Sequence, residues 1–504
     1  MIFKIILLIS VLAFSACAER RPGSRPVTVT LLILGDRPTG NRVDAVLEEI
    51  NKITSERIGA VLRLRHIEWA NWQNQYQLAL ASRDSSFDLV TTSTTWLFAW
   101  EIARRGGFYP LTPELLEKNA PKTWAAVSPA HWDICTWEDS IWFIPESQFT
   151  QYINHGMYWR KDWAKEGGLE EITVFEDLET YFDIVKEHIP DVFPWDISGN
   201  HLPLGMIGAY MQSKRMVQPI LGVATGNYTL FEYDVNDPYT VVSLAMDSNE
   251  MFEAARMFDR WAKKGFWRED VLNYQGEPYY LFISGLSGAY QHHTNSFFGV
   301  RVTMDLEQPG SDIQMYYFGQ ENNNVNKNLI THAAMAVNGA SGNVEKALQM
   351  YDLLRNDREL YLLFNYGIEG IDYIVNADGA FRRPDDFNDM TDLLGINFWG
   401  GRMDEFEPVW DNWWPGRQDM IDNLNSFTME YPLEKFIFDS SRVSAEMSAL
   451  GNVAMIHLPS LYFGKTADPD TAVEEFRAAL RQAGFDRVKE EIQLQLDLFK
   501  TQLK

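Results

Sequence analysis

Short apolar runs alternate with amphipathic segments through the first third of the chain. Val27–Leu34, Ala60–Ile67 and Phe87–Thr91 have the length of strands, and the first is apolar nearly throughout. The segment after each run carries apolar residues at spacings of three and four, the period of an amphipathic helix. Strands that alternate with helices predict a parallel sheet covered by helices. We therefore expect an α/β fold whose strands end, at their carboxyl ends, in loops that face a ligand.

The rest of the chain continues this pattern. Thr173–Glu187 and Asn249–Lys264 show helical spacing, and Leu329–Val337 has the composition of a strand. The C-terminus predicts two helices, the first capped by Asp468 and ended by Gly484. Because 504 residues exceed what one hydrophobic core usually supports, we expect two lobes.

The first 16 residues are typical of a bacterial secretion signal. The cation Lys4 precedes an apolar run at Ile5–Phe14, and the small residues Ser15–Ala16 come directly before Cys17. A cysteine at this point is typical of lipoproteins, and the run is too short for a lasting membrane span. We expect residues 1–16 to be removed, Cys17 to be lipidated and residues 17–26 to form a tether to the outer face of a membrane. An uncleaved anchor and a plain secretory signal are the alternatives.

Composition narrows the function. The net charge of −26 and the lack of a basic stripe argue against a nucleic-acid partner. With Cys17 acylated, Cys135 is left alone, which excludes an intramolecular disulfide and a cysteine-based metal site. We expect Cys135 to be a small buried hydrophobe. The 17 tryptophans exceed ordinary usage, and they either fill the core or stack on sugar rings.

Motifs of common catalytic sites are absent from the sequence. It has no H-E-x-x-H, Walker loop, G-x-G-x-x-G or G-x-S-x-G. The pair His292-His293 makes a poor metal site, because neighbouring residues on a strand point to opposite faces. We therefore expect no metal and no cofactor, and binding is favoured over catalysis. The sequence does not exclude a pair of catalytic carboxylates of the kind found in glycosidases.

Segments along the whole chain match one family in their order. They are the lipid cysteine with Val27–Leu34 and Asn41–Arg57; Phe87–Val90; Ile141–Glu146, with Ser140 where the family has glycine; Met157–Trp163; Tyr366–Tyr373; and Ala483–Asp486 through Gln493–Gln495. Together they resemble the extracellular solute-binding proteins of ABC importers. The resemblance is strongest to the large lipoproteins of family 1, the carbohydrate type, which often carry a C-terminal domain of unknown function.

The resemblance implies a periplasmic-binding-protein-like type II fold with two α/β lobes joined by hinge crossings. Lobe one is expected at 27–150 and 335–372, and lobe two at 151–334 and 373–504. It also implies a monomer that captures a carbohydrate, such as an oligosaccharide, and delivers it to the membrane subunits of an ABC permease. A peptide or polyol ligand fits the same kind of cleft. A surface enzyme acting on glycans, and a binding protein that signals or adheres without transport, are the competing functions.

Loops after the expected strands supply the candidate ligand contacts. Aromatic rings stack on sugar rings, and carboxylates, amides and hydroxyls bond sugar hydroxyls. Trp399, Trp410, Trp413 and Trp414 are expected to pack on lobe two rather than to cap the cleft. The predicted ligand-binding residues are Asp36, Arg37, Trp69, Trp72, Thr95, Trp96, Glu146, Gln148, Trp195, Tyr290, His292 and Glu369.

Overall fold

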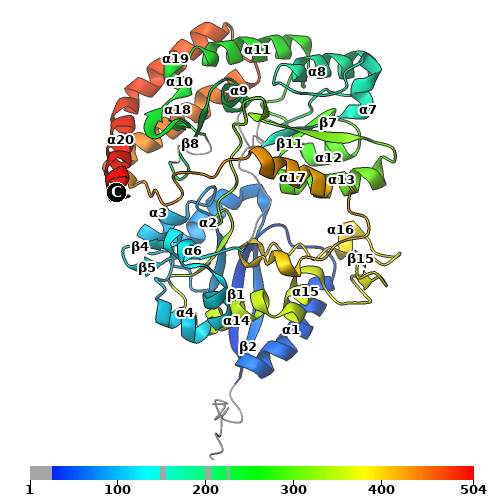
Figure 1. Ribbon diagram of the computed structural model, residues 1–504, viewed down its shortest axis with the longest axis vertical. Coiled ribbons are helices and arrows are strands. Elements are labelled where there is room, and N and C mark those ends of the chain that lie inside the picture. The colour runs from blue at the N-terminus through cyan, green and yellow to red at the C-terminus, as the bar shows by residue number, and fades with distance from the viewer. Residues whose placement is uncertain (1–24, 148–154, 199–205, 224–227, 504) are drawn as a thin grey trace, which may run out of the picture.

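The computed structural model describes residues 25–147, 155–198, 206–223 and 228–503. Figure 1 shows two lobes, of which the lower contains the first described residues and the upper contains the C-terminal helices. The predicted signal sequence and Cys17 lie outside the described residues. Within the described ranges, no helix combines the length and the apolar character that a bilayer crossing needs.

Lobe one is built on a five-stranded sheet. β1 (Val27–Leu34) pairs in parallel with β2 (Ala60–Ile67) and β3 (Leu89–Thr92), so the predicted alternation of strands and helices is confirmed. β13 (Ala334–Val337) and β6 (Ile144–Pro145) extend the sheet in the antiparallel sense. The second half of β1 is buried throughout, as expected of a strand with helices on both faces.

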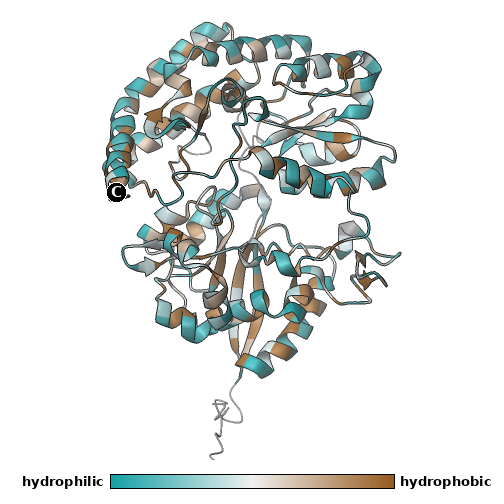
Figure 2. Cartoon of the chain, viewed as in Figure 1, coloured by the Kyte–Doolittle hydropathy of each residue, from teal (hydrophilic) through white to brown (hydrophobic). Residues whose placement is uncertain are grey.

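Helices cover this sheet and complete the first core. α1 (Arg42–Ile58) contacts β2, and α14 (Val344–Asn356) contacts β1, β2 and β13. α15 (Arg358–Tyr366) packs on both helices. Cys135 is fully buried in the same core, which confirms its predicted role as a small hydrophobe. Figure 2 shows the apolar strands at the centre of this lobe.

Lobe two is built on a smaller antiparallel sheet. β7 (Gly156–Arg160) lies between β11 (Ala289–His292) and β12 (Ile313–Tyr317). Asp468 accepts a hydrogen bond from the Thr471 amide, which confirms the predicted cap. The helices of this lobe include α8 (Asp177–His188), α11 (Glu250–Lys264), α13 (Thr294–Glu307), α17 (Arg417–Phe427), α18 (Ser444–Tyr462), α19 (Pro469–Gln482) and α20 (Phe485–Gln502).

The hydrophobic clusters divide the chain differently from the expected boundary at residue 372. Tyr373 stacks on Phe381 at a ring separation of 4.5 Å, and both join Tyr361 of α15 in one cluster. Phe398 packs on Phe364 of the same helix at 5.1 Å. Residues 373–411 therefore pack on lobe one, and the chain reaches lobe two only near α17. The segment has no regular apolar period that would reveal this packing from the sequence.

A tight backbone contact holds the segment containing η4 (Trp399–Gly401) on the lobe-one sheet. A Cβ atom added at Gly400 would lie 2.3 Å from the carbonyl oxygen of Ala334 in β13. The Gly400 carbonyl oxygen accepts a hydrogen bond from the Tyr351 hydroxyl of α14 at 2.6 Å. Only glycine permits this approach, so the position of Trp399 depends on it.

A buried carboxyl group lies where the chain leaves β6. Glu146 is 1% exposed, and neither of its carboxyl oxygens has a hydrogen-bond partner. Its backbone amide donates to the Ala333 carbonyl, and the amide of Ser147 donates to the Arg402 carbonyl. Burial raises the pKa of Glu146 well above its usual range, the charge of Asp404 raises it further, and Arg402 opposes the shift. The raised pKa of Glu146 favours its neutral, protonated form over the carboxylate.

Replacement of this acid by its neutral analogue should change how stability depends on pH. The unfolded chain ionises a glutamate near pH 4.3, whereas the native protein keeps Glu146 protonated above that pH. The native state then binds more protons, so the free energy of unfolding falls as pH rises through this window. Relative to the parent, Glu146→Gln should become more stable as pH rises above about 4.3, by up to about 1.4 kcal/mol for each pH unit over which native Glu146 keeps its proton, measured by urea unfolding. The exposed Glu170→Gln is the control, and a variant that loses stability over this range would contradict the assignment.

The Gly400 contact makes a second prediction. Gly400→Ala should lower stability by about 1–3 kcal/mol, because the new methyl group overlaps the β13 backbone and forces it to shift. Gly342→Ala is a matched control, since a Cβ at that position meets no atom within 4 Å. Thermal unfolding of both variants measures the difference. Equal melting temperatures would show that η4 moves away from β13 at no cost.

Candidate ligand-binding site

Four tryptophans meet at the carboxyl ends of the parallel strands in lobe one. Trp69 follows β2, Trp72 begins α2 (Trp72–Ala81), Trp96 follows β3 and Trp399 comes from η4. The ring centroids of Trp69 and Trp399 lie 6.0 Å apart in a stacked pair, and Trp72 and Trp96 lie 5.2 Å apart edge to face. Trp96 and Trp399 join the two pairs at 6.0 Å. We call these four residues the tryptophan cluster.

Local bonds hold the cluster while leaving indole surface exposed. The Trp69 backbone amide donates to the Asp36 carboxylate at 3.0 Å, so the turn after β1 positions the start of α2. The Trp96 indole N–H donates to the His332 carbonyl at 3.2 Å. Trp69 is 40% exposed, and the other three rings are half-buried. A partly open surface of fixed aromatic planes suits stacking on the apolar faces of sugar rings.

Four histidines lie where the chain crosses between the lobes. His155 precedes β7 and His332 precedes β13, whereas His292 ends β11 and His293 caps α13. The His292 and His293 rings lie 4.3 Å apart, and the His155 ring stacks on His292 at 5.6 Å. The His332 ring lies 6.5 Å from Trp96, so the histidines adjoin the tryptophan cluster.

Two of these histidines, His293 and His332, have lowered pKa values, which favour their neutral forms. Burial lowers the pKa of His332 to about 3, and the neighbouring His155 contributes to the shift. Burial also lowers the pKa of His293 well below its usual range, and the other three histidines add to this effect. The His332 Nδ1 atom bonds the Thr95 hydroxyl at 2.8 Å. A neutral imidazole has one donor and one acceptor, which matches a sugar hydroxyl. Among the described residues, no group of acidic, cysteine and histidine side chains is arranged to hold a metal ion.

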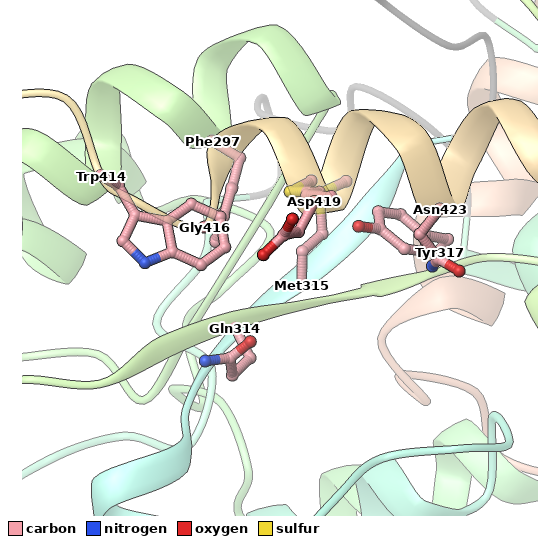
Figure 3. A pocket seen from close by; sticks show the side chains of 9 residues that line it. Phe297, Gln314, Met315, Tyr317, Trp414, Gly416, Asp419 and Asn423 are labelled. Atoms are coloured by element: carbon pink, nitrogen blue, oxygen red, sulfur yellow. The ribbon is translucent and has the colours of Figure 1, made fainter.

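Lobe two contributes a pocket of about 320 Å³ beside the edge strand β12. Figure 3 shows Asp419 projecting from α17 towards β12, with the Trp414 ring at one end and Asn423 and Tyr317 at the other. Tyr317 pairs with Gly156 across the sheet, and the following amide of Phe318 donates to the His155 carbonyl. The pocket therefore adjoins the histidines. In Figure 1, α17 lies along the margin of the upper lobe nearest to the lower one.

The structure brings some predicted residues together and separates others. Trp69, Trp72, Thr95 and Trp96 share one surface, with Asp36 behind Trp69 and His292 among the four histidines. Tyr290 is buried and its ring stacks on His292 at 5.7 Å, so it lies behind the histidines. Four other predicted residues lie elsewhere: Arg37 pairs with Asp44 at the surface; Glu146 is buried beside Arg402; Trp195 packs on Trp267 and Phe463 in the lobe-two core; Glu369 is exposed next to Tyr373. Gln148 lies outside the described residues.

Sequence reasoning missed several members of this surface. Trp399 was expected to pack on lobe two, but it joins the tryptophan cluster on lobe one. Trp414 lines the lobe-two pocket, whereas Trp410 packs on Tyr366 and Phe381. His155 and His332 carry no local motif. The only sequence signal for them was their position beside the segments where the chain changes lobes.

Two known protein families match parts of this chain, and a related protein matches nearly all of it. Residues 48–359 match the model of the bacterial extracellular solute-binding proteins, and residues 432–501, which include α18–α20, match a domain of unknown function, DUF3502. A carbohydrate ABC transporter substrate-binding protein of Streptococcus pneumoniae is 24% identical over 95% of this chain and 91% of its own length.

Two solved structures share the fold. The N-glycan transport solute binding protein (NgtS) of Streptococcus pneumoniae, in complex with Man1GlcNAc, superposes with a TM-score of 0.74 at 22% identity, over 94% of this chain and 99% of that one. The S. pneumoniae substrate binding protein FusA, in complex with kestose, gives 0.65 at 14% identity, over 94% and 100%. The predicted two-lobed α/β fold is confirmed by these matches. Because the family model covers more than half of its length, the chain belongs to the bacterial extracellular solute-binding proteins.

Proposed function

We propose that this protein captures an oligosaccharide between its lobes and delivers it to the permease of an ABC importer. The observation that carries the proposal is the tryptophan cluster at the carboxyl ends of the lobe-one strands. Its aromatic planes extend over several side chains, which suits a ligand of more than one sugar ring. The names of related proteins support the same class of ligand, since they include a carbohydrate ABC transporter substrate-binding protein and proteins in complex with Man1GlcNAc and kestose.

The proposed mechanism is closure of the two lobes around the sugar. Trp69, Trp96 and Trp399 offer stacking surface on lobe one, and the pocket beside α17 offers a second wall on lobe two. A ligand that contacts both walls favours the closed arrangement over the open one. The crossing next to His332 is a place where the backbone would bend. The closed form would then be the form that the permease recognises.

The cell-envelope location forms part of the proposal. Lipidation of Cys17 would hold the folded body at the outer face of a membrane through the tether at residues 17–26. Domains at 27–150 with 335–372, and at 151–334 with 373–504, were expected from the sequence. The packing of residues 373–411 favours assigning them to lobe one. Replacement of Cys17 by serine, followed by membrane fractionation, would separate a lipid anchor from a plain secretory signal.

Loss of one exposed indole should weaken sugar binding without unfolding the protein. We expect Trp69→Ala to raise the dissociation constant of a bound oligosaccharide about tenfold, because a stacking plane is lost. Calorimetric titration with neutral oligosaccharides selected by thermal shift measures the change. Trp124→Ala is the matched control, since Trp124 stacks on Trp132 away from the tryptophan cluster.

Two results would count against the proposal. Equal affinity of Trp69→Ala and the parent would remove the tryptophan cluster from the ligand site. Conversion of the bound oligosaccharide into shorter products, detected by chromatography after incubation, would indicate the competing function of a glycan-active enzyme. Recovery of the ligand unchanged is the expected outcome.

A further inference from the structure

The pocket beside α17 combines an apolar wall with a polar one. Phe297, Met315 and Met420 form the apolar wall, and both Phe297 and Met420 are buried. Asp419 and Asn423 lie on the polar side, on exposed turns of α17 (Figure 3). The pocket therefore offers apolar surface directly beside hydrogen-bonding groups.

The polar wall contains both acceptors and donors. The Asp419 carboxylate accepts hydrogen bonds, and the Asn423 carboxamide both donates and accepts. Gln314, across the pocket on β12, donates one amide hydrogen to Asp312 at 2.8 Å. The second amide hydrogen of Gln314 is a further donor to a ligand, and its carbonyl oxygen is a further acceptor. A ligand group that fits must therefore present a donor and an acceptor close together.

Trp414 closes one end of the pocket in a fixed orientation. Its ring lies edge to face with Phe297 at 5.9 Å, and the Arg301 guanidinium lies over it at 5.4 Å. These contacts hold the indole plane in place, where it can support one pyranose ring. The volume of about 320 Å³ is at the lower end for small-molecule sites, which suits one sugar unit rather than a whole glycan.

An acetamido group matches the two walls. It carries a methyl group, an N–H donor and a carbonyl acceptor within one small substituent. A hydroxyl group in its place has no methyl group to contact the apolar wall. If the hydroxyl itself lay against that wall, it would lose its hydrogen bonds to water without replacement. We propose that the pocket binds the 2-acetamido group of an N-acetylhexosamine unit, and that the protein thereby selects N-acetylated glycans over plain hexose glycans. This inference rests on the proposed function, because it requires that the ligand is a carbohydrate.

A matched pair of ligands tests the inference. Chitopentaose and cellopentaose have the same β-1,4-linked backbone and differ in the acetamido or hydroxyl group at each C2 position. Titration calorimetry of the folded protein should show at least tenfold tighter binding of chitopentaose. Equal binding, or a preference for cellopentaose, would overturn the inference and leave the proposed function standing. Binding of neither ligand would also overturn it, and the wider oligosaccharide screen would then show whether carbohydrate binding itself has failed.

Variants of α17 test whether the preference for chitopentaose over cellopentaose arises in the pocket. Asp419→Ala should weaken chitopentaose binding about tenfold and change cellopentaose binding little, because the proposal places the acetamido N–H against this carboxylate, whereas a C2 hydroxyl has no methyl group to hold it against the apolar wall. Asp422→Ala is the control, since Asp422 lies on the same helix and pairs with Gln418 outside the pocket. Both side chains are exposed, so neither change threatens folding. A preference that survives in Asp419→Ala would exclude Asp419 as its source and contradict the assignment of this pocket.

Discussion

The close approach of the Gly400 backbone to strand β13 is the contact on which the candidate site depends. It brings Trp399, from a segment distant in the sequence, over the carboxyl ends of the lobe-one strands. Without Trp399, the aromatic surface would consist only of Trp69, Trp72 and Trp96, which come from consecutive strand-end loops. The same contact holds the backbone of residue 402 beside Ser147, where the chain leaves lobe one. The contact between Gly400 and β13 therefore links the proposed ligand surface to a crossing between the lobes.

The crossing region is polar and yet carries several neutral groups. His332 and His293 have lowered pKa values, and Glu146 has a raised one, all chiefly because of burial. A strong buried ion pair would favour one arrangement of the lobes and oppose its loss. Neutral imidazoles instead exchange hydrogen-bond partners at low cost, which suits a protein that must open and close. Charged pairs are present as well: Arg402 pairs with Asp404 at 2.8 Å beside Glu146, and Arg104 of lobe one pairs with Asp439.

Local sequence patterns predicted the helices and strands better than they predicted which loops contact one another in the folded chain. The strands β1, β2 and β3 and the cap at Asp468 follow from periodicity and capping chemistry over a few residues. The rule that ligands bind at strand ends also selected Trp69, Trp72 and Trp96, which the structure brings together. Trp195, expected in the lobe-two wall, is instead buried in the lobe-two core, because an aromatic side chain packs equally well in a core or beside a ligand. His155, His332, Trp399 and Trp414 needed the tertiary structure, since no short segment records which loops the crossings bring together.

The central claim is that the two lobes close around a guest molecule that leaves unchanged. Small-angle X-ray scattering of the protein, with and without a saturating oligosaccharide identified by calorimetry, measures this closure. We expect a smaller radius of gyration when the sugar is bound, because closure brings the lobes together, and recovery of the intact sugar afterwards. An unchanged radius of gyration with the sugar bound would contradict the account.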